Sequence, residues 1–292
     1  MNFSLVVGTA NPVYINMFLR SLAKYTTLPV EVFVVLDNQE SDVPFVEMTQ
    51  DVRDAAKNLS IKWEALGKGY HGVGHAWNYG IDRTSGDWVG IMNDDIFFTE
   101  KWLEQLTAFI ETSVNLGVAS PSWHWRGVPN IEGLPPEHAW VLCEPWLEEY
   151  SKHAVSYGDV HKNDADYGIQ GCFFFLNRHT LNVMAAREKG IENHPGRFDE
   201  TSFFANWEDT DMCMRMNRIG YDMRVTHSTA LHHFGSQTVA RSDVKAQTGD
   251  FYHKGIPVFY RKWGIQEHLG KQFMVHNSIL TVDGHQYPSE RI

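Results

Sequence analysis

The sequence predicts an α/β protein with a mostly parallel central sheet flanked by helices. Three nearly continuous apolar runs, at residues 3–7, 30–36 and 88–92, alternate with segments whose apolar residues recur at helical spacing. Continuous apolar runs indicate strands that are buried on both faces, as in parallel sheets. Strands that alternate with helices in this way are typical of a doubly wound, Rossmann-like fold.

Length and composition predict one large domain over residues 1–292. Of the 292 residues, 43% are hydrophobic, which is ample for a buried core. We divide the domain into a half at 1–119, an aromatic-rich insertion at 120–168, a half at 169–265 and a C-terminal tail at 266–292.

Charge and cysteine content exclude some classes of function. The net charge of −11 disfavours non-specific binding to nucleic acid or to anionic membranes. The three cysteines are far apart and lack metal-ligand spacing, which favours buried thiols in a reducing compartment. No run approaches the roughly 20 apolar residues of a membrane helix, so we expect no transmembrane segment and a cytoplasmic protein.

The first strand, residues 3–7, leads into the loop Gly8 to Pro12 and a helix. In that helix, Tyr14, Phe18 and Leu22 recur at helical spacing. The second strand, 30–36, ends at Asp37, whose carboxylate is therefore expected at the edge of the sheet where ligands of such folds bind.

A helix at 43–58, a strand at 60–66 and a helix at 75–83 continue the alternation. Gly67 to Gly72 matches the dinucleotide fingerprint G-x-G-x-x-G, but that fingerprint normally follows the first strand, and two units precede it here. One interpretation of this motif is a cofactor loop, which would make the protein an NAD(P)-linked oxidoreductase. The favoured interpretation is that the glycines allow close approach to a ligand or close packing.

The fourth strand, 88–92, delivers Asn93, Asp94 and Asp95 to the same edge. Thr99 is expected to cap the helix that follows. Two adjacent carboxylates repel each other and need a cation, and oxygen ligands of this kind suit Mg²⁺ or Mn²⁺, which usually also contacts substrate phosphates.

The insertion at 120–168 is rich in aromatic residues and prolines, including Trp123, Trp125 and Trp140. Long irregular segments inside compact domains are usually functional or disordered, and this aromatic content argues against disorder. The tryptophans either form a platform for an acceptor or cover an edge of the sheet. The histidines of this segment show no ligand spacing and are assigned no metal.

After a strand at 169–176 and a helix near Arg178, Glu208 is expected to open a helix that stops at Gly220. Its first turn carries Glu208, Asp209 and Asp211, more acids than a helix dipole requires. Asp211 is placed to pair with Arg215 at i,i+4.

Short strands at 221–225 and 228–231 lead to His232 and His233. Neighbouring residues of a strand point to opposite faces, so at most one of these histidines joins a given site.

These motifs, in this order, resemble the family 2 glycosyltransferases of the A-type fold. The residues that carry the resemblance are Asp37; Gly69; Asn78 to Gly80; Gly86 and Asp87; Asn93 to Asp95; Phe198 to Glu200; Trp207 to Asp211; Arg215; His233 to Ser236; and Phe259 to Gly264.

The resemblance implies that Asp37 binds the base or ribose of a nucleotide sugar and that Asp95 holds the metal, with His233 or His232 as a late metal or phosphate ligand. Asn93 replaces the first acid of the family's D-x-D motif, and Asp94 stands at its middle position. The residues expected to bind the nucleotide sugar are Thr9, Asn11, Asp37, Gly69, Asn78, Asn93 and Asp94.

The resemblance also implies that Asp209 is the catalytic base, with Glu208 beside it. We expect Trp123, Trp125 and Trp207 to contact the acceptor.

The sequence thus predicts a metal-dependent glycosyltransferase that moves a sugar, with inversion, from a nucleoside-diphosphate sugar to a hydroxyl acceptor. The acceptor could be a glycan, a glycolipid, a protein or, less favoured by the acidic charge, a modified nucleobase. Two alternatives stay open: the oxidoreductase that uses Gly67 to Gly72, and a non-catalytic carbohydrate-binding protein that uses the tryptophans. The oligomeric state is not predicted.

Overall fold

A computed structural model shows how these segments fold. It describes residues 1–38, 56–124, 139, 141, 169, 172–234, 251–263, 273–276, 279–282 and 285–288. Residues 43–55 of the predicted helix at 43–58, and Trp125 and Trp140, therefore lie outside the described residues; residues 56–58 form a turn before the third strand, and not the end of a helix.

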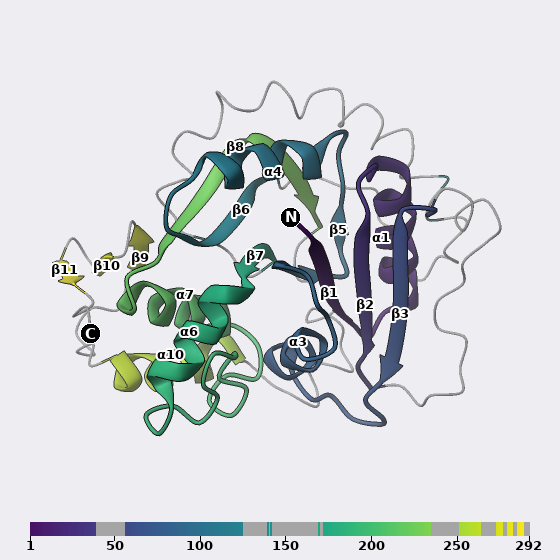
Figure 1. The fold of residues 1–292 in the computed structure, drawn as a ribbon. Coiled ribbons are helices and arrows are strands. Elements are labelled where there is room, and N and C mark those ends of the chain that lie inside the picture. The colour runs from purple at the N-terminus through teal and green to yellow at the C-terminus, as the bar shows by residue number, and fades with distance from the viewer. Residues whose placement is uncertain are drawn as a thin grey trace.

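An eight-stranded mixed sheet organises the molecule, in the order β3-β2-β1-β4-β7-β6-β8-β5 (Figure 1). Its strands are β1 (Phe3–Thr9), β2 (Val30–Leu36), β3 (Leu59–Ala65), β4 (Trp88–Asn93), β5 (Ile96–Phe97), β6 (Leu116–His124), β7 (Phe173–Asn177) and β8 (Asp222–His233).

The strands β3, β2, β1 and β4 run parallel, as the apolar runs predict. The strand β7 is inserted antiparallel between β4 and β6, while β6 and β8 run parallel and β5 closes the sheet antiparallel to β8. Both predicted halves of the chain therefore contribute strands to one sheet, and β6 crosses the boundary set at residue 120.

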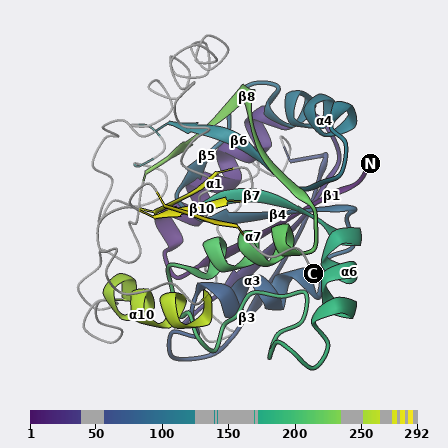
Figure 2. The same ribbon diagram turned by 90° about the vertical axis from the view of Figure 1, so that its left-hand side faces the viewer.

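Helices cover both faces of the sheet (Figures 1 and 2). The helices are α1 (Pro12–Tyr25), α3 (Val73–Ile81), α4 (Trp102–Thr112), α6 (Arg178–Glu188), α7 (Glu208–Arg218) and α10 (Phe251–Trp263). One apolar cluster joins α1 and α4 to one face of the sheet, through side chains such as Phe18 and Trp102. A second cluster joins α3, α6 and α7 to the other face, through side chains such as Trp77 and Met212.

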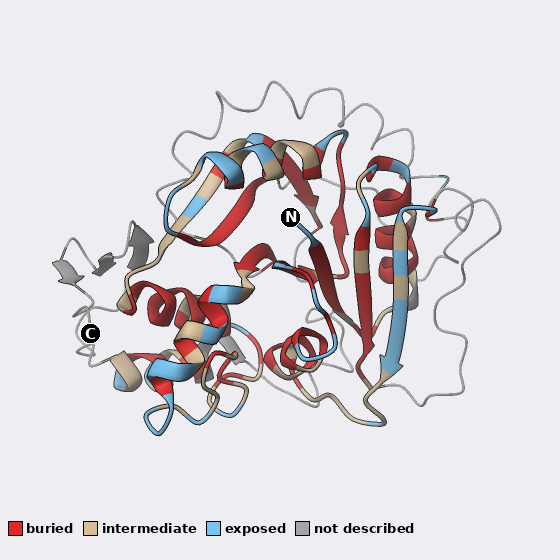
Figure 3. Cartoon of the chain, in the orientation of Figure 1, coloured by how far each residue is buried: buried red, intermediate tan, exposed pale blue. Residues whose placement is uncertain are grey.

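The central strands are buried, whereas β3 is largely exposed (Figure 3). In the predicted tail, β9 (Phe273–His276), β10 (Ile279–Val282) and β11 (His285–Pro288) form a separate three-stranded antiparallel sheet.

Several element boundaries differ from the sequence-based prediction. The residue before α4 is Lys101, and Thr99 is not its cap, because the Thr99 hydroxyl donates to the carbonyl of Ala230 at 2.8 Å. The expected strands at 221–225 and 228–231 form the single strand β8, with an irregular register opposite β6. The helix expected at 75–83 begins two residues earlier, at Val73.

Within the part of the chain that the structure describes, every helix is too short or too polar to cross a membrane.

Candidate active site

Polar side chains converge where β1, β2 and β4 end. The parallel register of β1 and β4 sets Gly8 opposite Asn93, which brings the next residues, Thr9 and Asp94, together. The Thr9 hydroxyl donates to Asp94 Oδ2 at 2.6 Å, and both side chains are buried. Asn11 follows as the cap of α1, where its side chain accepts from the backbone N–H of Val13.

Asp37 lies at the end of β2 and contacts the glycine-rich loop Gly67 to Gly72. Its carboxylate accepts from the backbone N–H groups of Asn38 and His71, and His71 Nδ1 lies 2.7 Å from Asp37 Oδ1. Asn38 in turn accepts from the N–H of Gly69 at 2.8 Å. The loop that matched a dinucleotide fingerprint is thus folded onto the end of β2.

Two glycines of this region are required by close packing. Gly72 has a φ of +97°, and a Cβ there would lie 2.7 Å from the carbonyl oxygen of Phe204. Gly80, on α3, packs directly against Val6 of β1. Within the loop 67–72, close packing therefore accounts for Gly72. Gly67 and Gly69 have φ values of +96° and +98°, and a Cβ at either position would meet nothing within 4 Å, so the backbone conformation and not close packing favours glycine there.

Asp95 meets His233 because β5, which starts one residue after Asp95, pairs with the end of β8. His233 Nε2 lies 3.1 Å from Asp95 Oδ1, and the N–H of Phe234 donates to the Asp95 carbonyl at 3.0 Å. Burial disfavours charge on His233, but the Cys172 sulfur and the Asp95 carboxylate favour it, so the pKa of His233 is raised. His232 is buried and packs edge-on against the ring of Phe234.

The chemistry of Asp95 and His233 fits a divalent cation. Their carboxylate oxygen and imidazole nitrogen are close enough to share an ion, and Mn²⁺ and Mg²⁺ are often held by one or two protein groups together with water and substrate phosphates. Among the residues that the structure describes, there is no cluster of three or more His, Cys, Asp or Glu side chains suited to a metal. A cation here would therefore depend on the substrate for several of its ligands.

The acidic start of α7 forms the second part of the site. Asn206 and Trp207, just before the helix, have φ values of +69° and +78°. Glu208 is buried, and its Oε2 has no hydrogen-bond partner among the described residues. Burial, together with the neighbouring charges of Asp209 and Asp211, raises the pKa of Glu208 well above its ordinary value. Asp209 is partly exposed, and its Oδ1 accepts from the N–H of Thr210 at 2.7 Å.

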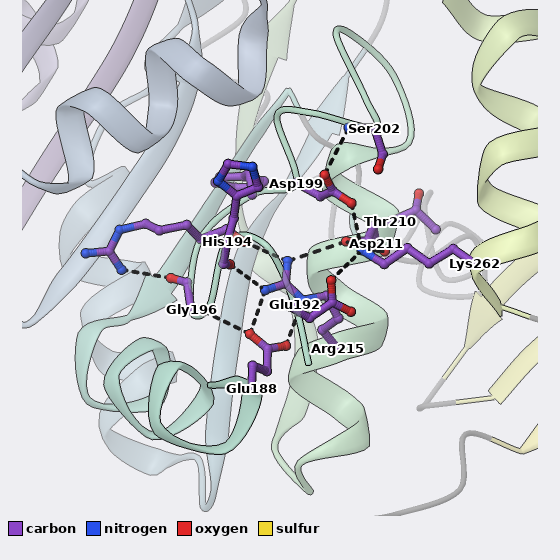
Figure 4. Close-up of polar contacts among 12 residues, drawn as sticks. Glu188, Glu192, His194, Gly196, Asp199, Ser202, Thr210, Asp211, Arg215 and Lys262 are labelled. Carbon is purple, nitrogen blue, oxygen red and sulfur yellow. Dashed lines mark hydrogen bonds and ion pairs between the residues drawn. The ribbon is translucent and has the colours of Figure 1, made fainter. Parts of the chain in front are cut away.

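A buried ion network surrounds the rest of α7 (Figure 4). Arg215 forms a two-point contact with Glu188, at 2.7 and 2.6 Å, and lies 3.5 Å from Asp211, which confirms the predicted i,i+4 pair. Lys262 of α10 contacts Asp211 at 3.1 Å and Asp199 at 2.9 Å. The sequence did not single out Lys262, because the residues that it contacts are more than 50 positions away.

Two predicted contact residues are engaged inside the protein. The Asn78 amide bonds to both the N–H and the carbonyl of Phe198, at 2.9 Å each, and to Glu200 at 2.7 Å, which fastens α3 to the segment before α7. Trp207 is 5% exposed and its ring lies 5.0 Å from that of Phe259. The predicted contact of Asn78 with the donor, and of Trp207 with the acceptor, stays a prediction.

Of the predicted acceptor platform, the backbone of Trp123 lies in β6, opposite Leu231 of β8. The structure describes neither the side chain of Trp123 nor any part of Trp125.

The eight-stranded mixed sheet flanked by helices has the A-type fold of the solved glycosyltransferases to which it is similar. The sequence model of "Glycosyl transferase family 2" matches residues 4–183, well over half of the chain. The chain therefore belongs to glycosyl transferase family 2. The matched region contains Asp37 and Asp95 but ends before Glu208 and Asp209.

A curated relative and two solved structures are similar to the chain. "Uncharacterized glycosyltransferase YwdF" of Bacillus subtilis (strain 168) is 31% identical over 116 residues, which are 39% of this chain and 40% of that protein. The S. aureus TarS 1-349 structure in complex with UDP has a TM-score of 0.51 at 20% identity, and the match covers 80% of this chain and 60% of that one.

Mannosyltransferase PcManGT from Pyrobaculum calidifontis, in complex with GDP-Man and Mn²⁺, has a TM-score of 0.52 at 14% identity, over 89% of this chain and 68% of that one. At these identities the two structures show that the fold is shared. The match covers less than two thirds of the YwdF protein and of this TarS chain.

Proposed function

We propose that this protein is a metal-dependent glycosyltransferase that moves a sugar, with inversion, from a nucleoside-diphosphate sugar to a hydroxyl group. The observation that carries the proposal is the contact of Asp95 with His233 at the edge of the sheet where Asp37 and Asp94 also lie. Ligands of open α/β sheets bind at this edge, beyond the carboxyl ends of the strands.

The donor half of the site would use the ends of β1, β2 and β4. Asp37 is assigned to the base or ribose, and its fixed position, held by backbone N–H groups, suits a recognition role. The other residues assigned to the nucleotide sugar are Thr9, Asn11, Gly69, Asn78, Asn93 and Asp94. Similar folds hold UDP, UDP-GlcNAc, or GDP-Man with Mn²⁺, which supports a nucleoside-diphosphate sugar as the donor class.

Asp95 and His233 would hold Mn²⁺ or Mg²⁺, and a cation bound there supplies charge neutralisation for the diphosphate leaving group. His232 is buried against Phe234 on the other side of the strand, so we assign the ligand role to His233.

Asp209 would accept the proton of the acceptor hydroxyl as the sugar is transferred. It is the more exposed of the two adjacent carboxyl groups at the start of α7, and a general base must reach its substrate. Glu208 is buried, which raises its pKa and favours the protonated carboxyl; in that form it can donate a hydrogen bond, and we assign it to orienting the acceptor.

Family membership favours this activity over the two alternatives. The loop Gly67 to Gly72 folds onto Asp37 and Asn38, Gly72 packs against Phe204, and Gly67 and Gly69 have positive φ, so the loop is accounted for without a nicotinamide cofactor. Thermal shift with NAD(H) is a direct control for the oxidoreductase.

The proposal is tested by incubating the protein with UDP-, GDP-, dTDP- and CMP-sugars without acceptor, with Mn²⁺, with Mg²⁺ and with EDTA. We expect one nucleoside-diphosphate sugar to be hydrolysed only with the divalent cation. Equal hydrolysis in EDTA would contradict the metal site, and stabilisation by NAD(H) with no hydrolysis of any donor would contradict the whole proposal.

A further inference from the structure

Side chains of α10 contact α7, the helix that begins with Glu208 and Asp209, and the residue just before it; Figure 4 shows Lys262 of α10 reaching Asp211 of α7. Just before α7, the ring of Phe259 on α10 lies 5.0 Å from that of Trp207. In the first turn of α7, Lys262 Nζ and Trp263 Nε1 both bond to Asp211, at 3.1 and 3.0 Å. At the end, Arg218 lies over the Trp263 ring, 4.6 Å from its centre.

The turn that α10 covers has an unusual backbone. Asn206 and Trp207 are consecutive residues with positive φ, at +69° and +78°. A positive φ is unfavourable for a residue as large as tryptophan, and such conformations persist only where the surroundings enforce them. This turn directly precedes Glu208 and Asp209, so its conformation determines where the backbone of both residues lies.

Two glycines allow close contacts with the turn and with the residues just before it. Gly255 of α10 lies directly against the indole of Trp207, and a Cβ at position 255 would overlap the indole Cδ1. Gly72 leaves room for Phe204, whose carbonyl accepts from the N–H of Val73 at 2.9 Å. The segment 204–207 is therefore in contact with both α10 and the start of α3.

Lys262 adds an electrostatic restraint to the same helix pair. Its ammonium group lies 3.1 Å from Asp211, 2.9 Å from Asp199 and 3.1 Å from Glu192. Three carboxylates around one ammonium group fix α10 against both α7 and the segment before it, because a buried charge is stable only when it stays paired.

We propose that α10 positions the catalytic base. Gly255 and Lys262 are positioning residues: Gly255 admits the Trp207 ring, which holds the turn at 206–207, and Lys262 holds the first turns of α7, so that Asp209 meets the acceptor. The inference rests on the proposed role of Asp209 as the base. In this proposal, the buried Trp207 ring helps to orient the base.

The substitution Gly255→Ala tests this without removing a charged or aromatic group. Alanine is favoured over glycine inside a helix, so a simple propensity effect would stabilise α10. The added methyl group must instead displace the Trp207 ring. The matched control is Gly74→Ala in α3, where the new Cβ would meet only ordinary contacts at 3.5 Å or more.

The first readout is amide hydrogen exchange, which needs no donor. We expect faster exchange across residues 203–211 in Gly255→Ala, including the N–H of Asp211 that donates to the Trp207 carbonyl at 2.8 Å, and unchanged exchange in β1 and β4. Exchange at 203–211 equal to that of Gly74→Ala would overturn the inference.

The second readout is hydrolysis of UDP-GlcNAc and of GDP-mannose with Mn²⁺, with UDP and GDP binding measured alongside. We expect kcat to fall on the order of tenfold or more, because small displacements of a catalytic group are costly, while nucleotide affinity and KM stay within about twofold. In an Asp209→Asn background, Gly255→Ala should cause no further loss, because both changes act through one carboxylate. If the reductions in kcat caused by the two substitutions multiplied in the double variant, the inference would be overturned.

The outcome separates this inference from the proposed function. Normal turnover in Asp209→Asn contradicts the assignment of the base, whereas low turnover in Asp209→Asn with normal turnover and exchange in Gly255→Ala contradicts the role of α10 alone. If Gly255→Ala does not fold, Lys262→Arg, which keeps the charge but changes its reach, is judged by the same two readouts.

Discussion

Replacing Arg215 with methionine should destabilise the protein strongly while leaving the sheet edge untouched. The guanidinium is 1% exposed, forms two charge-assisted bonds to Glu188 and donates to the carbonyls of Arg197 (2.6 Å) and His194 (2.9 Å). Methionine keeps an unbranched apolar stem but is shorter and has no donor. Among the described residues, the Glu188 carboxylate would keep only the N–H of Gly196, at 2.9 Å.

Breaking a buried ion pair from one side costs roughly 3–5 kcal/mol, because the remaining charge is left without compensation. Total stabilities are about 5–15 kcal/mol, so this change would remove a large part of the free energy of unfolding. The shift in Tm should be on the order of 10 °C for a domain of this size.

Urea unfolding of the wild type, Arg215→Met, Glu188→Gln and Arg215→Met/Glu188→Gln measures the effect. The double variant removes both charges, and its loss in free energy of unfolding should be smaller than the sum of the losses in the two single variants, because the two side chains interact directly. A loss below about 1 kcal/mol in Arg215→Met with an unchanged m-value would refute the reasoning, since it would mean that the buried carboxylate does not need its partner.

Three further predictions concern the site itself. Asp95→Asn should weaken Mn²⁺-dependent binding of UDP or GDP in calorimetry and leave the fold intact, because a loop carboxylate buries little apolar area; unchanged affinity would contradict the metal assignment. Because folding raises the pKa of Glu208 above 4.5, the folded state holds this proton more tightly, so its contribution to stability is present below that pH and is lost as pH rises through the folded pKa. Glu208→Gln should lack this decline, and parallel curves of stability against pH would contradict the raised pKa. Trp125→Ala should raise the acceptor KM and spare donor hydrolysis if the ring stacks on the acceptor, whereas a loss of roughly 3–5 kcal/mol in stability would indicate a buried edge cover.

The strand pattern could be predicted because a strand that is buried on both faces has apolar residues at nearly every position. The apolar runs that became β1, β2 and β4 are such cases, and their parallel register then brought Thr9 and Asp94 together. The start of α7 at Glu208 and the pair of Asp211 with Arg215 were also predictable, since both depend on spacing within one helix.

Features that depend on distant segments could not be predicted. The place of β7 between β4 and β6 depends on tertiary pairing, and the Asn78 amide is occupied by a residue 120 positions away. Thr99 resembled a helix cap because its type and spacing fit, but its hydroxyl bonds to β8. The positive φ of Trp207 has no signal in its own residue type, and Gly255, which packs against its indole, lies on a distant helix.

The most direct test of the central claim is the transfer rate of Asp209→Asn, measured with the donor found by the nucleotide-sugar screen and with the anomeric configuration of the wild-type product determined by NMR. The account predicts that kcat falls by roughly 10²- to 10⁴-fold, the usual contribution of a positioned proton acceptor, while Mn²⁺-dependent nucleotide binding is unchanged and the wild-type product is inverted. Full activity in Asp209→Asn, or a product that retains the configuration of the donor, would contradict it.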